Sequence, residues 1–259
     1  MADYEFIKTE TDGNLFIITI NRPDVMNACH PPTNDELENA FDTFAANDDL
    51  WVAIVTGAGE RAFSAGNDLK YQAEGGKMWR PKKGFGGITS RFDLNKPVIA
   101  AVNGVAMGGG FEIALACDII VASDNAIFAL PEPRVGLLAA AGGVHRLPRS
   151  IPLKQAMGMM LTGRRVSAAE GQTLGFVNEV VPQTDLMDAA RAWAAQILEC
   201  SPLSVRATKE AAYAGFNADS IEQAIETIYP GMAIMRDSED FVEGPKAFAE
   251  KRKPNWKGR

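Results

Sequence analysis

The stretch MGGGFEIALACD, residues 107–118, decides how the rest of the sequence is interpreted, because it sets three glycines directly before an apolar run that contains one acid. Glu112 has apolar neighbours on both sides, and no Lys or Arg lies within several residues of it. A carboxylate in such surroundings is costly to ionise. We therefore expect Glu112 to serve chemistry rather than to be a solvated helix residue.

The three glycines, Gly108 to Gly110, indicate a place where a strand ends and a helix begins at Phe111–Glu112. Unpaired N–H groups and the positive end of the helix dipole collect at such a start. Glycine also lets a carbonyl oxygen approach the backbone closely. Two N–H donors that converge on one oxygen form an oxyanion hole. A simple tight turn is the structural alternative.

A second acid, Glu132, follows 20 positions later between Pro131 and Pro133. The two prolines restrict the backbone and so aim the side chain. Two carboxyls in one pocket repel each other and hold their pKa values apart, so that one acts as a base and the other as an acid. The alternative for each glutamate alone is a solvated or capping residue.

Uninterrupted apolar runs predict strands buried on both faces at 51–57 and 97–104, with two further short strands in 117–132. Helical patterns lie between these runs, so the fold class is α/β. A hairpin is expected around Asp12-Gly13-Asn14. A helix is expected over 34–48, with Asn34 or Asp35 as its N-cap.

The chain beyond about residue 150 reads as mostly helical. It has a capping box from Ser167 to Glu170 and amphipathic helices at 186–200 and 220–235. The apolar residues there fit an oligomer interface or packing on the chain's own core equally well. The glycine-rich segment 71–90 is irregular, as in a loop over a site.

Composition limits the function classes. The 259 residues are 46% hydrophobic with a net charge of −7, typical of a soluble globular protein and unfavourable to nucleic acid or an anionic membrane as main partner. No signal peptide or membrane span is expected. Cys29, Cys117 and Cys200 have no metal-ligand spacing, which indicates reduced thiols, a cytoplasmic location and no metal.

A loose dinucleotide fingerprint, Gly57-x-Gly59-x-x-Ala62, follows one of the apolar runs. That motif requires a helix to begin at once, whereas residues 63–68 read as a turn. The acid expected about 20 positions further on also has no clear candidate. A nicotinamide-dependent oxidoreductase is therefore disfavoured.

An ordered set of segments resembles the enoyl-CoA hydratase/isomerase (crotonase) family over nearly the whole chain. The segments are NRPDVMNA, AFSAGNDL, KPVIAAVNGVAMGGGFEIALACDIIVAS, FALPEPRVGL, GGVHRLPR, LTGRRVSAAEGQTLGFVNEVV and FAEKRKP. The resemblance implies a spiral of ββα repeats over residues 1–195 and a helical C-terminal oligomerisation region over 196–259. Trimers, or dimers of trimers, are the implied assemblies.

The resemblance further implies an acyl-CoA substrate and a stabilised thioester enolate, with coenzyme A as part of the substrate and no other cofactor. It assigns the oxyanion hole to the backbone N–H groups of Asn67 and Gly109, and the two acids of a hydratase to Glu112 and Glu132. It also implies coenzyme A or substrate contacts at Ala28, Ala65, Asp68, Leu69, Phe248 and Lys251, the last two often reaching a neighbouring subunit.

The implied activity is reversible hydration of a trans-2-enoyl-CoA, with Glu112 as base toward water and Glu132 as proton donor to the α-carbon. Residues 109–118 and 243–259 look most like the carnitinyl-CoA dehydratase (crotonobetainyl-CoA hydratase) branch. An enoyl-CoA isomerase is a further alternative. A non-catalytic acyl-CoA or RNA-binding homologue is a different class, against which both glutamates and the acidic charge argue.

Overall fold

The computed structural model describes residues 4–77, 79 and 81–259, and its described strands form two sheets. The larger sheet has the order β1-β2-β3-β5-β7-β10 and the smaller one β4-β6-β8-β9. The strands of the larger sheet are β1 (Ile7–Asp12), β2 (Leu15–Ile20), β3 (Val52–Gly57), β5 (Val98–Val102), β7 (Ile119–Ser123) and β10 (Glu179–Val181). Those of the smaller sheet are β4 (Ala62–Ser64), β6 (Val105–Met107), β8 (Ile127–Ala129) and β9 (Val166–Ser167).

The chain repeats one unit three times: a strand in the larger sheet, a strand in the smaller sheet, then helical structure. The helical parts are α2 (Leu69–Ala73), α3 (Gly109–Ala116), and the short η3 (Glu132–Val135) followed by α4 (Gly143–Ser150). Neighbouring repeats pair in parallel in both sheets. The carboxyl ends of β4, β6 and β8 therefore meet at one edge. The predicted α/β spiral of ββα units is confirmed.

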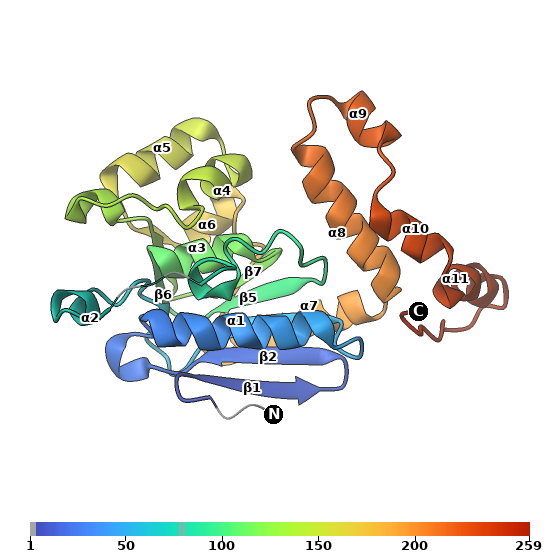
Figure 1. The fold of residues 1–259 in the computed structure, drawn as a ribbon, viewed down its shortest axis with the longest axis horizontal. Helices are drawn as coiled ribbons and strands as arrows, with labels where there is room; N and C mark the ends of the chain where they lie inside the picture. Colours follow the sequence, from blue (N-terminus) through green and yellow to red (C-terminus); the bar gives the residue numbers. More distant parts are fainter. Residues whose placement is uncertain (1–3, 78, 80) are drawn as a thin grey trace.

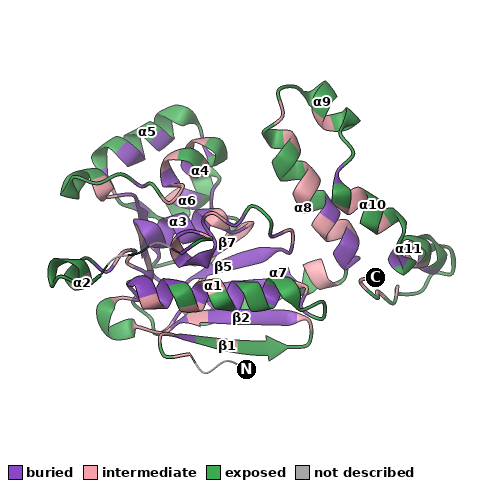
Figure 2. Ribbon diagram, viewed as in Figure 1, coloured by how far each residue is buried: buried purple, intermediate pink, exposed green. Residues whose placement is uncertain are grey.

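Burial explains why the larger sheet tolerates uninterrupted apolar runs. All residues of β3 and β5 are buried, as Figure 2 shows for β5. α1 (Pro31–Ala46) lies over β1 and β2, and α7 (Leu186–Leu198) packs on β3, β5 and β7 (Figure 1). A sheet covered on both faces has no solvent side to require alternating polar residues.

An aromatic cluster packs beneath α3. The rings of Phe111, Phe128 and Phe176 lie with centroids 5.1–5.2 Å apart. Aromatic pairs at such distances in tilted or edge arrangements add to the hydrophobic burial. This packing therefore fixes the position of the first turn of α3, which contains its glycines and Glu112.

Two helix starts differ from the prediction. α1 begins at Pro31, not near Asn34 or Asp35, because His30 is its cap and accepts the Thr33 N–H at 3.3 Å. Proline is favoured at a helix start, where its missing N–H costs nothing. α3 begins at Gly109, two residues before the expected start, so the middle glycine supplies its first N–H group.

The predicted hairpin is confirmed, since β1 and β2 pair antiparallel around Gly13, and Ser167 caps α6 (Ala168–Leu174) as expected. The single helix expected over 220–235 is wrong. The chain forms α9 (Ile221–Glu226) and α10 (Pro230–Arg236), because Pro230 cannot continue a helix from the preceding turn. The remaining elements are α5 (Leu153–Thr162), α8 (Pro202–Phe216), α11 (Glu239–Ala249), η1 (Pro23–Val25), η2 (Phe85–Gly87) and η4 (Gln183–Asp185).

The helices α8 to α11 form an arm that extends away from the sheets (Figure 1). Lys209 and Tyr213 on α8 attach the arm to Asp118 at 2.7 and 3.1 Å. Its exposed apolar side chains are Phe216, Ile221, Ile225, Ile228, Ile234, Phe241, Val242 and Phe248. Packing on the chain's own core therefore does not account for these residues, and such surfaces mark interaction sites. Within the part of the chain that the structure describes, no helix has both the length and the apolar character needed to cross a bilayer.

Gly110→Ala tests the contact between α3 and β4. An added Cβ lies 2.0 Å from the Ser64 carbonyl oxygen, so we expect a loss of about 2–3 kcal/mol in the free energy of unfolding in urea. The control is Gly158→Ala on exposed α5, where nothing lies within 4 Å and alanine favours the helix by up to ~1 kcal/mol. Equal stability of the two variants would contradict the packing described.

Candidate active site

The bend between β6 and α3 is possible only with glycine at its centre. Gly108 has φ +53° and ψ −124°, a conformation that other residues avoid. Its N–H donates to the Ala129 carbonyl oxygen at 2.9 Å, which ties the bend to β8. The N–H of Gly109, the first of α3, donates to none of the described residues. A donor at a helix start is thus left for a ligand.

The turn after β4 brings a second such donor beside the first. Gly66 has φ +85°, and a Cβ there would lie 2.8 Å from the Gly109 nitrogen. The turn is held by hydrogen bonds from Cys29 N–H to Gly66 O at 2.7 Å and from Asp68 N–H to Cys29 O at 3.2 Å. The Asn67 N–H between them has no acceptor in the described part of the chain. Two unpaired N–H groups from successive repeats therefore lie at one junction.

Asp68 holds this turn in place. Its Oδ2 pairs with Arg22 at 2.8 Å, and its Oδ1 accepts the Tyr71 N–H at 3.0 Å as the cap of α2. Burial opposes ionisation, but the hydrogen bonds from Tyr71 and Arg22 outweigh it and lower the pKa of Asp68. Both carboxylate oxygens are thus engaged within the protein. This geometry makes Asp68 a support for Asn67.

The other predicted contact residues divide into two groups. Ala28 and Ala65 lie beside this turn, since the Ala65 N–H donates to Met26 O at 3.0 Å, and Leu69 is 47% exposed at the start of α2. Phe248, 87% exposed, and Lys251 lie at or just after the end of α11 in the arm, away from α2 and α3 (Figure 1). The fold of one chain does not bring these two to the glycine bend.

Glu112 sits in the first turn of α3 and is only 3% exposed. Its Oε1 accepts the Gly143 N–H at 2.8 Å. Burial raises the pKa of Glu112 to about 7; the Gly143 N–H opposes this rise, and repulsion from the Glu132 carboxyl adds to it. The carboxyl therefore changes charge near neutral pH, where a general base or acid works best.

Glu132 begins η3 and reaches back to the glycine bend. A Cβ on Gly108 would lie 3.0 Å from the Glu132 Oε1. The Glu132 Oε2 is buried without a hydrogen-bond partner among the described residues, and burial raises the pKa of this carboxyl. A buried polar atom without a partner is rare and calls for an explanation, such as a ligand. The structure thus brings together the two acids that the sequence singled out.

Sequence reasoning missed the backbone donor to Glu112 and the position of the Phe85 ring over Gly109. The Gly143 N–H that binds Glu112 comes from the first residue of α4, and the paired glycines 142–143 were the available signal for a helix start with unpaired donors. The Phe85 ring covers Gly109, where an added Cβ would lie 2.4 Å from the Phe85 Cε1. It lies in η2, inside an irregular stretch that gives no periodic signal.

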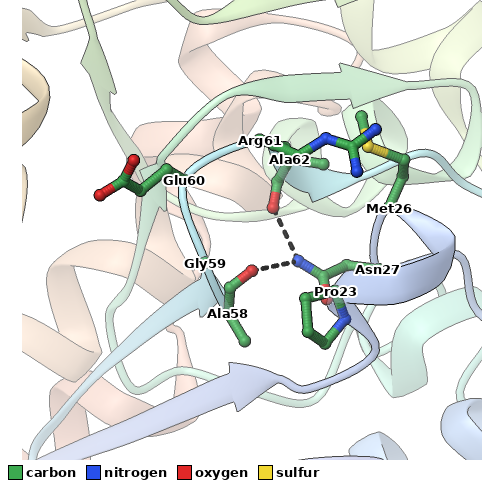
Figure 3. A pocket seen from close by; sticks show the side chains of 8 residues that line it. All are labelled: Pro23, Met26, Asn27, Ala58, Gly59, Glu60, Arg61 and Ala62. Carbon is green, nitrogen blue, oxygen red and sulfur yellow. Dashed lines mark hydrogen bonds between the residues drawn. The ribbon is translucent and has the colours of Figure 1, made fainter.

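The turn at Gly57–Gly59 does not have the geometry of a dinucleotide site. The Asn27 Nδ2 closes it by donating to Ala58 O at 3.0 Å and to Ala62 O at 2.7 Å (Figure 3). A strand, β4, follows instead of the helix that the fingerprint requires.

The described residues contain no group of three His, Cys, Asp or Glu side chains placed to hold a metal ion. Cys29 is fully buried, and burial raises the pKa of its thiol to about 12. Burial also raises the pKa of Cys117. Neither thiol is ionised at neutral pH, so neither is a nucleophile there.

A hollow of about 410 Å³ lies next to the glycine bend. It is lined by Met107, Ala129, Pro131, Arg134, Gly163, Arg164 and Arg165. Met107 and Pro131 directly precede Gly108 and Glu132, but neither glutamate lines this hollow. Arg164 pairs with Glu170 at 2.7 Å, and the Arg134 Nε donates to Thr162 O at 2.7 Å.

The raised pKa of Glu112 predicts a pH-dependent difference in stability between the wild type and Glu112→Gln. Between the ordinary value of 4.5 and about 7, the unfolded chain ionises this group while the folded chain keeps it neutral. The stability contributed by neutral Glu112 is therefore lost as the pH rises through about 7. From pH 5 to pH 8, Glu112→Gln should gain about 2–3 kcal/mol relative to the wild type in urea unfolding. A difference independent of pH would show that Glu112 titrates normally.

Comparisons with known proteins agree with this geometry. The family model described as enoyl-CoA hydratase/isomerase matches residues 10–259. A carnitinyl-CoA dehydratase of Proteus mirabilis (strain HI4320) is 48% identical over 255 residues, covering 96% of this chain and 97% of the relative. A carnitinyl-CoA dehydratase of Salmonella agona (strain SL483) is 46% identical over 262 residues, covering 98% and 99%.

Solved structures agree as well. The enoyl-CoA hydratase of Mycobacterium tuberculosis H37Rv superposes with a TM-score of 0.91 at 38% identity, covering 98% of this chain and 99% of the other. A probable enoyl-CoA hydratase/isomerase of Mycobacterium abscessus gives a TM-score of 0.92 at 40% identity, with all of both chains covered. On its sequence, its fold and the arrangement of its site, this chain belongs to the enoyl-CoA hydratase/isomerase family.

Proposed function

We propose that this protein is a hydro-lyase that reversibly adds water to a trans-2-enoyl-CoA. One observation carries the proposal: the buried carboxyl of Glu112 and the partly buried carboxyl of Glu132 meet at a glycine bend beside two backbone N–H groups that have no acceptor among the described residues. The hydratase and dehydratase names of its relatives support the same reaction class.

The N–H groups of Asn67 and Gly109 act on the thioester carbonyl. Their position at the junction of two repeats suits a single oxygen that accepts both hydrogen bonds. Water attack at the β-carbon turns that oxygen into an enolate oxyanion, which binds these donors more tightly than the ground-state carbonyl does. A single donor of this kind contributes about 10²–10³ in rate.

The two carboxyls divide the proton transfers. Glu112 as carboxylate takes a proton from water while the water oxygen bonds to the β-carbon. Glu132, whose pKa burial raises, delivers its proton to the α-carbon of the enolate. The pKa of Glu112, about 7, lets the ionised base be present at neutral pH. Proton exchange with solvent then restores ionised Glu112 and protonated Glu132, so the net reaction is addition of water to the double bond. This reaction needs no redox step or metal, and coenzyme A enters only as part of the substrate.

The arm suits assembly into a trimer or a dimer of trimers. Its exposed apolar side chains would be covered by other copies, and Phe248 and Lys251 would then contact coenzyme A bound to a neighbouring subunit. The described cysteines are all free, which supports a cytoplasmic location.

A narrower candidate is dehydration of carnitinyl-CoA, the activity in the names of relatives 46–48% identical to this chain. A trimethylammonium group binds favourably over aromatic faces. Phe85 covers Gly109, and Trp79, anchored by its Nε1 on Asp35 at 2.9 Å, lies in the same segment. The Phe85 ring favours a cationic acyl group beside the oxyanion donors.

Glu112→Gln and Glu132→Gln test both forms of the proposal. Each should lower kcat for hydration of crotonyl-CoA by about 10²–10⁴, because each removes one proton transfer. The loss of absorbance of the conjugated thioester measures the rate. For the narrower candidate, kcat/KM with crotonobetainyl-CoA should exceed that with crotonyl-CoA.

The matched control is Glu74→Gln, at an exposed glutamate after α2. This variant should leave the rates with crotonyl-CoA and crotonobetainyl-CoA unchanged. Turnover like the wild type in both active-site variants would refute the mechanism. A 3-enoyl-CoA product without hydration would identify an isomerase, and salt-sensitive RNA binding without turnover would identify a non-catalytic homologue.

A further inference from the structure

The hydrogen bond from Gly143 to Glu112 follows a mostly exposed loop, which the hydrophobic core holds at Ala139. Residues 133–138 and Ala140 are exposed, and only Ala139 is buried within this connection. Loops with so little burial are the more mobile parts of a fold. Yet Gly143 must stay close, since a Cβ on it would lie 3.1 Å from the Glu112 Cγ. A polar contact adds to the buried Ala139 in fixing the end of this loop.

Arg146, one turn into α4, supplies that contact. Its guanidinium folds back over the loop, so that a Cβ on Gly142 would lie 2.1 Å from the Arg146 Nη1. The Nη1 donates to Ala141 O at 3.5 Å, and the Nη2 donates to Thr89 O at 2.9 Å. The guanidinium also lies 5.9 Å from the centre of the Phe92 ring.

These contacts join two segments that serve the two halves of the site. Residues 139–143 present the Gly143 N–H to Glu112, whereas residues 85–92 carry Phe85, which covers Gly109. Arg146 has no ion pair in the described part of the chain, and its partners are backbone carbonyl oxygens. The planar guanidinium binds two such acceptors at once, which the ammonium group of lysine does less well.

We propose that Arg146 is a positioning residue that clamps the 139–143 loop to the 85–92 segment and so keeps the Gly143 N–H on Glu112 Oε1. This inference rests on the proposed function, because it assigns Arg146 a part in the work of the base. Arg146 itself is not assigned any contact with the substrate.

The positive charge of Arg146 lowers the pKa of Glu112, as does the Gly143 hydrogen bond that Arg146 holds in place. The charged groups that face Glu112 are Glu132 from η3, which raises the pKa of Glu112, and Arg146 from α4, which lowers it. The N–H groups of Gly143 and Ala141 also lower it. Loss of the guanidinium removes its positive charge and releases the loop, so the pKa of Glu112 rises above its value of about 7.

Three variants separate positioning from a purely structural role. Arg146→Gln removes the charge and one arm of the clamp, Arg146→Lys keeps the charge, and Arg149→Gln is the control on the same helix. Arg149 is exposed, and among the described residues its side chain donates only to His145 O, at 2.9 Å. Urea unfolding checks that each variant is folded before it is compared.

The first readout is the pH profile of kcat with crotonyl-CoA. The second is the infrared band of the Glu112 carboxyl, measured without substrate from pH 5 to 10 and identified by its absence in Glu112→Gln. For Arg146→Gln we expect kcat at pH 7 to fall about fivefold and both titrations to move about one pH unit higher. Arg146→Lys should move them less, and Arg149→Gln not at all.

The proposal would be overturned if the infrared titration of Arg146→Gln had the same midpoint as that of the wild type. It would also be overturned if the pH profile of kcat for Arg146→Lys matched that for Arg146→Gln. The infrared readout does not need turnover. An infrared shift in a protein that hydrates no enoyl-CoA would therefore refute the proposed function and leave the positioning role of Arg146 standing.

Discussion

The site depends on one constraint: the backbones of successive turns of the spiral must approach each other closely where they meet. A Cβ would lie 2.0 Å from Ser64 O at Gly110 and 2.6 Å from Met107 O at Gly66. No side chain fits at such distances. Because these glycines let the turns touch, the N–H groups that follow β4 and begin α3 share one junction, and Glu112 and Glu132 reach it from two different repeats.

Electrostatics follow from this packing. The junction excludes water from Glu112, so its carboxyl gives up hydration and receives in return only a few directed donors, chiefly the Gly143 N–H. Glu132 receives less compensation for its lost hydration, because its Oε2 has no hydrogen-bond partner among the described residues. Two acids with raised pKa values beside unpaired N–H donors form a site suited to moving protons near neutral pH while stabilising a developing oxyanion.

Much of this arrangement was readable from the sequence, because it is local. The apolar runs, the triple glycine and the proline-flanked Glu132 each carry their meaning within a few residues, and the order of the family segments supplied their arrangement. The predictions that were wrong also have physical causes. Pro31 moved the start of α1 ahead of the expected cap, and Pro230 divided a periodic stretch into two helices. The Gly143 donor and the Phe85 cover depend on contacts between distant segments, which no periodicity records.

A crystal structure with butyryl-CoA, a saturated thioester that cannot be hydrated, tests the central claim most directly. The account predicts the thioester oxygen within about 3 Å of both the Asn67 and Gly109 nitrogens, with the Glu112 carboxyl facing the β-carbon and the Glu132 carboxyl facing the α-carbon. A thioester bound elsewhere, for example in the arginine-lined hollow beside Met107, or an acyl chain directed away from either glutamate, would contradict it.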